Sequence, residues 1–238
     1  MKTVLITGGS RGIGRAMVEA FSKNGYSVAF TYKSSEKEAR ELAEKTGALA
    51  IRADSASETD VELAVKKALE HLGSVECLIN NAGISSFSLF TDLSLADWNN
   101  TLVVNLTGAF LYSKAVIPDM LKRKRGRIIN ISSMWGLVGS SCEVHYSTAK
   151  AGLIGMTKAL AKELGPSGIT VNAIAPGVIN TEMNKALSDE DLSILKEETP
   201  LMRIGEADDV ASSALFLAGE GASFITGEVL NVSGGYVI

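Results

Sequence analysis

The chain has 238 residues, of which 46% are hydrophobic and 21% charged, so it is long enough to bury the core of one domain spanning residues 1–238. Its formal net charge of −4 offers no strong electrostatic attraction for nucleic acid, and we expect no nucleic-acid partner. The one basic run, at residues 122–127, is interpreted as the solvated end of a helix.

Two features bear on the compartment of the protein. Cys77 and Cys142 are the only cysteines, too few for a disulfide framework or a thiolate metal site, and we expect no metal. No apolar run approaches the ~20 residues of a membrane span, and no signal-peptide pattern precedes the first predicted strand. We therefore expect a cytoplasmic protein with no membrane partner.

The first predicted elements are a strand, a glycine-rich loop and a helix. Residues 2–7, KTVLIT, predict a strand buried on both faces of a parallel sheet. Gly8, Gly12 and Gly14 follow, just before an amphipathic helix from about Ile13 to Lys23. Glycine lets the backbone turn sharply and approach a pyrophosphate, while a helix N-terminus offers free N–H groups. In this position the motif indicates a dinucleotide site.

The end of the second predicted strand, at residues 26–35, bears on the choice of cofactor. An acidic residue about twenty residues after the glycines would hydrogen-bond the ribose 2′-hydroxyl of NAD. Here the residues are Thr31, Tyr32, Lys33 and Ser34. Together with Arg11 in the glycine loop, they can face a 2′-phosphate, which favours NADP(H). The alternative is that Lys33 and Arg11 are ordinary surface charges.

Helices and strands then alternate, as expected for a doubly wound α/β sheet. Asp54 ends one predicted strand and Asn80 to Gly83 end another, which places both at the edge where open α/β sheets bind ligands. Further helices are predicted at residues 36–45, 58–72, 93–121, up to 164 and 206–219, and further strands end at residues 133, 177 and 232. Residues 179–199 have weak periodicity, and we interpret them as a mobile lid over the substrate rather than a plain surface connection.

Three polar residues suggest carbonyl chemistry. Tyr146 and Lys150 lie four residues apart, on one face of a predicted helix, and Ser133 ends a strand thirteen residues before the tyrosine. We expect the Lys150 ammonium to lower the pKa of the Tyr146 phenol, which is ordinarily near 10. Such a tyrosine can exchange a proton with a substrate oxygen that the serine holds. This arrangement predicts interconversion of a ketone and an alcohol.

The order of these motifs resembles that of the classical short-chain dehydrogenase/reductase family. The glycine loop TGGSRGIG, then NNAG, then Asn105 in an apolar helix, then Ser133, Tyr146 and Lys150, and finally a Pro-Gly turn follow one another along the whole chain. The resemblance implies a single-domain Rossmann-type parallel sheet of seven strands with helices on both faces. It also implies a nicotinamide cofactor and a homotetramer.

The resemblance assigns roles to individual residues. In the family scheme Tyr146 gives its proton to the carbonyl oxygen, Lys150 also holds the nicotinamide ribose, and Asn105 anchors a water that relays protons. Asp54 resembles the residue that meets the adenine. The full set expected at the cofactor is Gly8, Ser10, Arg11, Gly12, Ile13, Gly14, Tyr32, Lys33, Ser34, Asp54, Ser55, Asn81, Ala82, Gly83, Tyr146, Lys150, Pro176, Gly177, Ile179 and Thr181.

Within the family the chain is most similar to bacterial 3-oxoacyl-acyl-carrier-protein reductases, notably in VNAIAPGVINTEM and ITGEVLNVSGGYV. This similarity implies an NADPH-dependent reductase of fatty-acid synthesis, with acyl carrier protein as partner. Two features differ from that pattern. Ser167 stands where those reductases often carry an arginine that docks the carrier protein, although Lys124 remains near the other docking position.

The second difference is Glu143, three residues before Tyr146, which places a carboxylate where the substrate is expected. With Ser133 and Tyr146 it completes our predicted substrate-binding set. MWG followed by SCEV is similar to reductases of the 5-aminopentanone modification of elongation factor P, whose amine a carboxylate would suit. Alternatively, Glu143 caps a helix or pairs with a neighbouring subunit. A third hypothesis is a non-catalytic NADP(H)-binding sensor, which would have no need of the proton donor.

Overall fold

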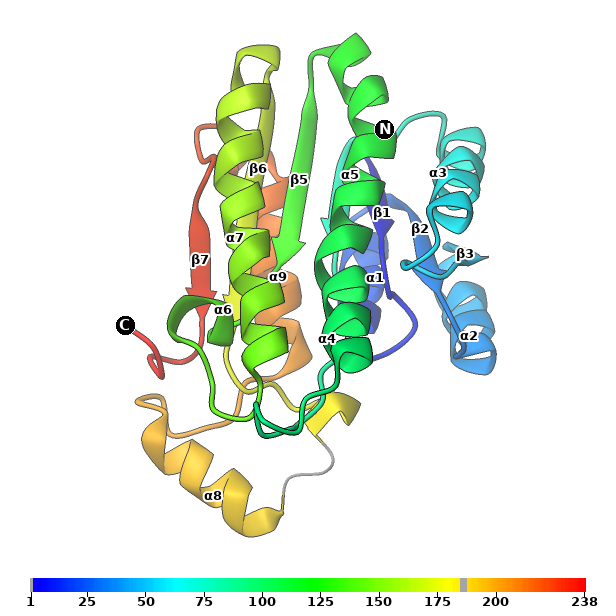
Figure 1. Ribbon diagram of the computed structural model, residues 1–238. Helices are drawn as coiled ribbons and strands as arrows, with labels where there is room; N and C mark the ends of the chain where they lie inside the picture. Colours follow the sequence, from blue (N-terminus) through cyan, green and yellow to red (C-terminus); the bar gives the residue numbers. More distant parts are fainter. Residues whose placement is uncertain (1, 185–187) are drawn as a thin grey trace.

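A computed structural model describes residues 2–184 and 188–238 of the chain. These residues form one seven-stranded parallel sheet in the order β3-β2-β1-β4-β5-β6-β7, with helices on both faces (Figure 1). The predicted doubly wound α/β class is therefore confirmed. The point where the strand order reverses, between β1 and β4, is where such sheets open a crevice for a ligand.

The predicted alternation of strands and helices is also confirmed. The strands are β1 Thr3–Ile6, β2 Ser27–Tyr32, β3 Leu49–Arg52, β4 Cys77–Asn80, β5 Gly126–Ile131, β6 Ile169–Pro176 and β7 Val229–Val232. The α-helices are α1 Gly12–Lys23, α2 Glu36–Thr46, α3 Glu58–Leu72, α4 Leu95–Leu102, α5 Gly108–Arg123, α6 Trp135–Val138, α7 Val144–Leu164, α8 Asp189–Glu198 and α9 Ala207–Ala218. Short 3₁₀ turns lie at η2 Gly165–Ser167, η3 Glu182–Asn184 and η4 Glu220–Ala222.

The sheet separates two hydrophobic cores because successive side chains of a strand point to opposite faces. In β1, Val4 and Ile6 contact the core beneath α1, α2 and α9, whereas Leu5 contacts the core beneath α3, α5 and α7. Strands covered on both faces need apolar residues at nearly every position. This explains why β1 and β4 are buried along their whole length.

The parallel strands bring their carboxyl ends to one edge of the sheet. In Figure 1 the loop after β4, the connection between α6 and α7, and the turn η3 all lie at this edge, and α8 lies beyond them. The edge therefore gathers the predicted site residues that follow β1, β4, β5 and β6.

The long helix predicted at residues 93–121 has a different interior from the one expected. It consists of α4, a π-helical segment η1 at Val103–Thr107, and α5. A π-segment inserts one residue into the turn and is often found at functional sites. The stretch Leu95–Arg123 is long and apolar enough to resemble a membrane span by composition. We interpret it as a core helix, because it is partly buried and packs on α3, α7 and the sheet.

The segment interpreted as a lid contains a regular helix that the weak periodicity did not predict. Ser188 is the N-cap of α8, and its hydroxyl oxygen accepts a hydrogen bond from the Asp191 N–H, while Asp191 accepts one from the Ser188 N–H. This reciprocal capping box stabilises the first turn. Residues 185–187 of the predicted lid lie outside the described residues.

Candidate active site

The glycine loop is folded too tightly for side chains at two of its positions. Gly8 has φ +64°, and a Cβ added there would lie 2.9 Å from the Ala82 Cα. A Cβ at Gly14 would lie 2.1 Å from the Gly8 carbonyl oxygen. Helix α1 then begins with no side-chain cap and no acidic residue in its first turn, so its N–H groups remain available. This loop fits the pyrophosphate of a dinucleotide.

Two buried threonines hold this loop: Thr7, which the sequence analysis did not single out, and Thr31, which it grouped with the residues expected at the 2′-phosphate. The Thr7 hydroxyl oxygen accepts hydrogen bonds from the N–H groups of Asn81 and Ala82, each at 2.9 Å. The Asn81 amide donates to the carbonyl oxygens of Thr7 and Gly8, each at 3.0 Å. Thr31 accepts from the Gly8 N–H at 3.3 Å. Through its two hydrogen bonds to Thr7 and Gly8, Asn81 stabilises the loop. A threonine at or just after the end of a buried strand is the sequence feature that could have predicted this role for Thr7.

The residues expected at the 2′-phosphate are at the correct edge, but their charges are paired. Lys33 Nζ lies 2.6 Å from Asp54 Oδ2, and Arg11 Nε lies 3.8 Å from Glu182 Oε2. Burial alone would raise the pKa of Asp54, but the hydrogen bonds from Lys33 and the Ala56 N–H outweigh it and lower that pKa. Both pairs are exposed enough for water and ions to weaken them.

The four predicted catalytic residues converge in a buried cluster. Asn105, Ser133, Tyr146 and Lys150 are exposed by 1%, 7%, 8% and 4% respectively. Gly83 lies between two of them: a Cβ there would be 2.6 Å from Asn105 Oδ1 and 3.4 Å from Lys150 Nζ. Because Gly83, the glycine that ends NNAG, has no side chain, Asn105 and Lys150 can both lie close to the loop after β4.

Asn105 occupies the middle of the π-segment. Its amide nitrogen donates to the carbonyl oxygens of Ile84 and Thr101, each at 2.9 Å, and its oxygen accepts from the Ile84 N–H at 3.2 Å. Both amide hydrogens are therefore engaged by the protein. A relayed water, as the family scheme implies, would have to use the remaining lone pair of the oxygen. The side chain also fixes the turn that follows Gly83.

The Lys150 ammonium is held by one backbone carbonyl rather than by the phenol oxygen. Its Nζ donates to the Ile131 carbonyl oxygen at 2.8 Å and lies 5.5 Å from the centre of the Tyr146 ring. The Ser132 hydroxyl donates to the Lys150 carbonyl oxygen at 2.9 Å. These bonds join the end of β5 to the middle of α7.

The expectation that Lys150 lowers the pKa of Tyr146 is wrong in this structure. Burial raises the pKa of Tyr146 to about 12, and the nearby Glu143 carboxylate adds to the rise, whereas the Ser133 hydroxyl opposes it. Burial lowers the pKa of Lys150 to about 8. Desolvation outweighs attraction here because the ammonium lies over the ring and bonds a carbonyl oxygen.

The Ser133 hydroxyl lies within hydrogen-bonding reach of the Tyr146 phenol. Its oxygen accepts a hydrogen bond from the Trp135 N–H at 3.1 Å, at the start of the short helix α6 that the sequence analysis did not predict. The O–H therefore remains able to donate to a substrate oxygen. Its proximity to the phenol of Tyr146 places two donors beside one another.

Several of the remaining predicted cofactor residues lie at the end of β6 or just after it. The Pro176 carbonyl oxygen accepts from the Met134 N–H at 2.9 Å, next to Ser133, and the Gly177 N–H donates to Val232 at 3.0 Å. Thr181 faces Gly12 across the crevice. Further predicted residues lie along the same edge: Ser10 in the glycine loop, Ile13 in the first turn of α1, Tyr32 at the end of β2, Ser34 after it, and Ser55 and Ile179 after β3 and β6.

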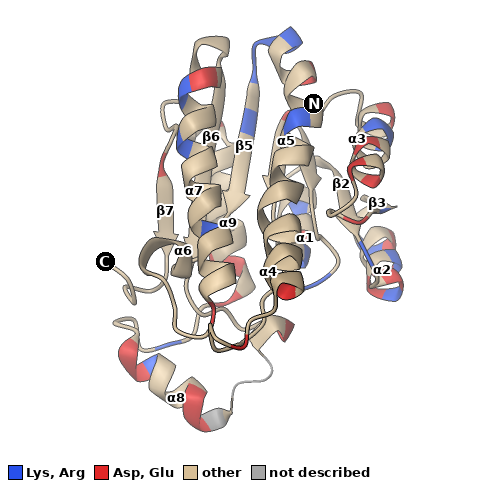
Figure 2. Cartoon of the chain, viewed as in Figure 1, with Lys and Arg blue, Asp and Glu red and all other residues tan. Residues whose placement is uncertain are grey.

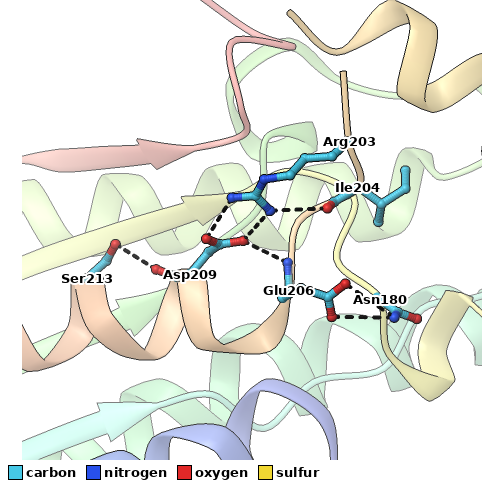
Figure 3. A network of polar contacts seen from close by, with 6 residues as sticks. All are labelled: Asn180, Arg203, Ile204, Glu206, Asp209 and Ser213. Atoms are coloured by element: carbon cyan, nitrogen blue, oxygen red, sulfur yellow. Dashed lines mark hydrogen bonds and ion pairs between the residues drawn. The ribbon is translucent and has the colours of Figure 1, made fainter. Parts of the chain in front are cut away.

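A polar network fixes the segment that carries Ile179 and Thr181 (Figure 3). Arg203 binds Asp209 through two nitrogens, at 2.7 and 2.8 Å. Asp209 also accepts from the Glu206 N–H at 2.8 Å, and the Glu206 carboxylate accepts from the Asn180 amide at 3.4 Å. The start of α9 thereby holds Asn180, near the beginning of the predicted lid, and Arg203, just after its end.

Comparisons with known proteins identify relatives of nearly full length. Residues 8–237 match the family described as enoyl-(acyl carrier protein) reductase. The chain is 45% identical to the 3-oxoacyl-[acyl-carrier-protein] reductase FabG of Aquifex aeolicus, over 98% of this chain and 96% of that protein. It is 42% identical to the 3-oxoacyl-[acyl-carrier-protein] reductase of Synechocystis, over 100% and 97% respectively.

A solved structure has the same fold. A short-chain dehydrogenase/reductase variant of Serratia marcescens is 36% identical, with a TM-score of 0.93, and 99% of this chain and 97% of that chain are covered. The nucleotide crevice and the Ser-Tyr-Lys cluster define a nicotinamide-dependent oxidoreductase. The chain belongs to the short-chain dehydrogenase/reductase family, as the order of its motifs predicted.

Proposed function

We propose that this protein reduces the ketone of a 3-oxoacyl group on acyl carrier protein to a 3-hydroxyacyl group, with NADPH as the reductant. The observation that carries the proposal is the buried cluster of Asn105, Ser133, Tyr146 and Lys150 beside the glycine loop. Relatives at 45% and 42% identity bear the name of this activity. None of the relatives reported above supports the elongation factor P reductase or the sensor.

A bound reduced nicotinamide supplies the hydride to the carbonyl carbon. The chain supplies the proton and holds the oxygen. Tyr146 is protonated at neutral pH, and burial raises its pKa further, so it can donate to the developing alkoxide. Ser133 donates a second hydrogen bond to that oxygen, and Lys150 offers a positive charge from the Ile131 side of the cluster. Transfer of this proton to the alkoxide completes the alcohol.

We prefer NADPH to NADH as the cofactor for two reasons. No acidic residue stands at the end of β2, and the cations Lys33 and Arg11 lie near it. Lys33 must exchange Asp54 for a 2′-phosphate, which is feasible because the pair is exposed. We expect Lys33→Ala to raise the KM for NADPH about tenfold and to leave the KM for NADH nearly unchanged. Equal effects on both cofactors would contradict this assignment.

The remaining parts of the proposal concern partners and location. Lys124, which caps α5 with φ +51°, is the residue that the resemblance puts near a docking position, and we propose that it contributes to binding an acidic carrier protein. We place the protein in the cytoplasm, since Cys77 and Cys142 are both free thiols, as a reducing compartment requires. We further propose that the protein is a homotetramer.

The test is NADPH oxidation with acetoacetyl thioesters of acyl carrier protein and coenzyme A, for the wild type and Tyr146→Phe. The variant keeps the ring and its packing but loses the proton donor, so we expect turnover to fall at least a hundredfold. NADPH binding, followed by fluorescence, should persist. Binding of NADPH without turnover of either thioester by the wild type would overturn the proposal. In parallel, an altered mass of elongation factor P after gene deletion would favour the alternative reductase.

A further inference from the structure

The segment that follows β7, residues 233–238, packs tightly against the chain that leaves α8. Gly234 and Gly235 have φ of +66° and +89°. A Cβ at Gly234 would lie 2.7 Å from the Thr199 Cγ2, and one at Gly235 would lie 2.9 Å from the Pro200 Cγ. Two consecutive glycines therefore allow the segment to turn and to approach the end of the predicted lid. In Figure 1 the segment lies between α6 and the chain after α8.

Tyr236, in this segment, connects α8 with α6. Its hydroxyl donates a hydrogen bond to Oε2 of Glu198, the last residue of α8, at 2.8 Å. This bond raises the pKa of Tyr236, so the phenol remains a donor. Its ring meets the ring of Trp135 edge-on, with the ring centres 5.9 Å apart and the planes at 87°. Edge-to-face contact at this separation is favourable for two aromatic rings.

Helix α6, which begins with Trp135, has few contacts of its own to hold it in place. It is four residues long, none of them is fully buried, and it has no side-chain cap. So short a helix is marginal without tertiary contacts. Its backbone packs on α7 at Gly136, where a Cβ would lie 2.8 Å from the Lys150 carbonyl carbon. The contact between the rings of Trp135 and Tyr236 adds a side-chain anchor on another side of the helix.

The position of α6 bears directly on Ser133. The Trp135 N–H donates to the Ser133 hydroxyl oxygen at 3.1 Å, and the Gly136 N–H donates to the Ser133 carbonyl oxygen at 2.9 Å. A serine hydroxyl that accepts a hydrogen bond has fewer directions left in which to donate its own proton. The place of the Trp135 backbone therefore determines where the Ser133 O–H points.

We propose that Tyr236 is a positioning residue for the carbonyl reduction: through Trp135 it orients the Ser133 hydroxyl, and through Glu198 it joins α6 to the end of α8. The inference rests on the reduction proposed above. Tyr236 gives no proton to the ketone and acts through Ser133. A hydroxyl that already points at the ketone oxygen need not reorient as the alkoxide develops, which lowers the barrier to hydride transfer. The ring of Tyr236 thus serves the chemical step, and its hydroxyl serves the placement of α8.

The experiment compares Tyr236→Phe, which loses only the hydroxyl, with Tyr236→Leu, which loses the ring as well. The rate is that of single-turnover oxidation of enzyme-bound NADPH by acetoacetyl-coenzyme A in stopped flow. We expect Tyr236→Leu to lower this rate about five- to tenfold, within the range of one edge-on aromatic pair. Tyr236→Phe should keep the rate within about twofold and raise the KM for the thioester a few-fold, because the end of α8 is released.

A matched control tests whether any lost aromatic pair would have the same effect. Tyr26 meets Phe21 edge-on, with ring centres 4.8 Å apart, at the opposite edge of the sheet. Tyr26→Leu should lower the melting temperature as Tyr236→Leu does but leave the single-turnover rate unchanged. Equal slowing by both variants would attribute the loss to stability and overturn the inference.

A second measurement tests whether Tyr236 acts through Ser133. Calorimetry gives the affinity of acetoacetyl-coenzyme A for the enzyme with NADP⁺, which cannot reduce it. With Ser133 present, Tyr236→Leu should bind the thioester a few-fold more weakly than Tyr236→Phe, since the two differ only in the ring. In the Ser133→Ala background the ratio of the two affinities should be near one.

The outcomes distinguish this inference from the proposed function. Equal single-turnover rates for Tyr236→Phe and Tyr236→Leu, or an affinity ratio that is the same with and without Ser133, overturn the orienting role and leave the proposed function standing. An unchanged KM in Tyr236→Phe overturns the link to α8. If the wild type binds NADPH but reduces neither thioester, the inference and the proposed function both fall.

Discussion

At the scale of single residues, the site depends on two groups whose ionisation is governed by burial. The raised pKa of Tyr146 keeps the phenol protonated, ready to donate, and Ser133 and Glu143 act on it in opposite directions. The lowered pKa of Lys150 records the cost of placing an ammonium where it is 4% exposed. The buried Lys150 ammonium therefore lowers the stability of the fold, and we interpret it as retained for function.

This cost predicts that Lys150→Met inactivates the enzyme while raising the melting temperature of the free protein by a few degrees at pH 7. The folded pKa of about 8 lies below the value of 10.5 expected in the unfolded chain, so the unfolded state binds more protons between these values. Wild-type stability therefore rises with pH across this window. The advantage of the variant should be greatest below pH 8 and shrink toward pH 10.5 in thermal melts. A difference that does not vary with pH would contradict the argument.

At the scale of elements, the sequence predicted regular structure wherever hydrophobic periodicity and glycine placement agreed. The strands buried on both faces and the helix carrying Tyr146 are examples. It failed where local geometry departs from a regular repeat. The π-segment around Asn105 leaves the apolar pattern of a continuous helix unchanged, and α8 is amphipathic over too few turns to stand out. The prediction for the pKa of Tyr146 was wrong because the spacing of Tyr146 and Lys150 along a helix does not show that the Lys150 ammonium donates to the Ile131 carbonyl oxygen.

The network between Arg203 and Asp209 makes a prediction about the anchor of the predicted lid. The hydrogen bonds from Arg203 lower the pKa of Asp209, so its contribution is present at neutral pH and lost as the pH falls below the unfolded value of 3.8. We expect Asp209→Asn to lower the melting temperature by a few degrees at pH 7 and by much less near pH 3. Because Asn180 is fastened to the same turn, the KM for NADPH should also rise. A deficit of equal size at both pH values would argue against the ion pair.

At the scale of the whole molecule, charge is distributed unevenly over the helices. Acidic and basic residues alternate on α2 and α3, whereas few occur along the middle of α7 and of the run from α4 to α5 (Figure 2). Several exposed positions there are apolar or small: Phe110 is 48% exposed, with the Lys114 ammonium over its ring, and Ala151 and Gly155 face outward on α7. Small residues let a second helix approach closely, and an uncharged face is typical of an interface core.

This face predicts that chains associate in pairs through it, as one of the two interfaces of the proposed tetramer of four 25.1 kDa chains. Phe110→Asp places a carboxylate in the apolar contact and should reduce the mass to that of a dimer or monomer in sedimentation velocity. Leu63→Asp is the matched control, since Leu63 is exposed by 52% on α3, away from α7, and should leave the tetramer intact. A monomeric wild type, or equal loss of assembly in both variants, would refute this interface. Because Asn105 and Tyr146 lie on the elements that meet there, we expect the smaller Phe110→Asp species to lose activity as well.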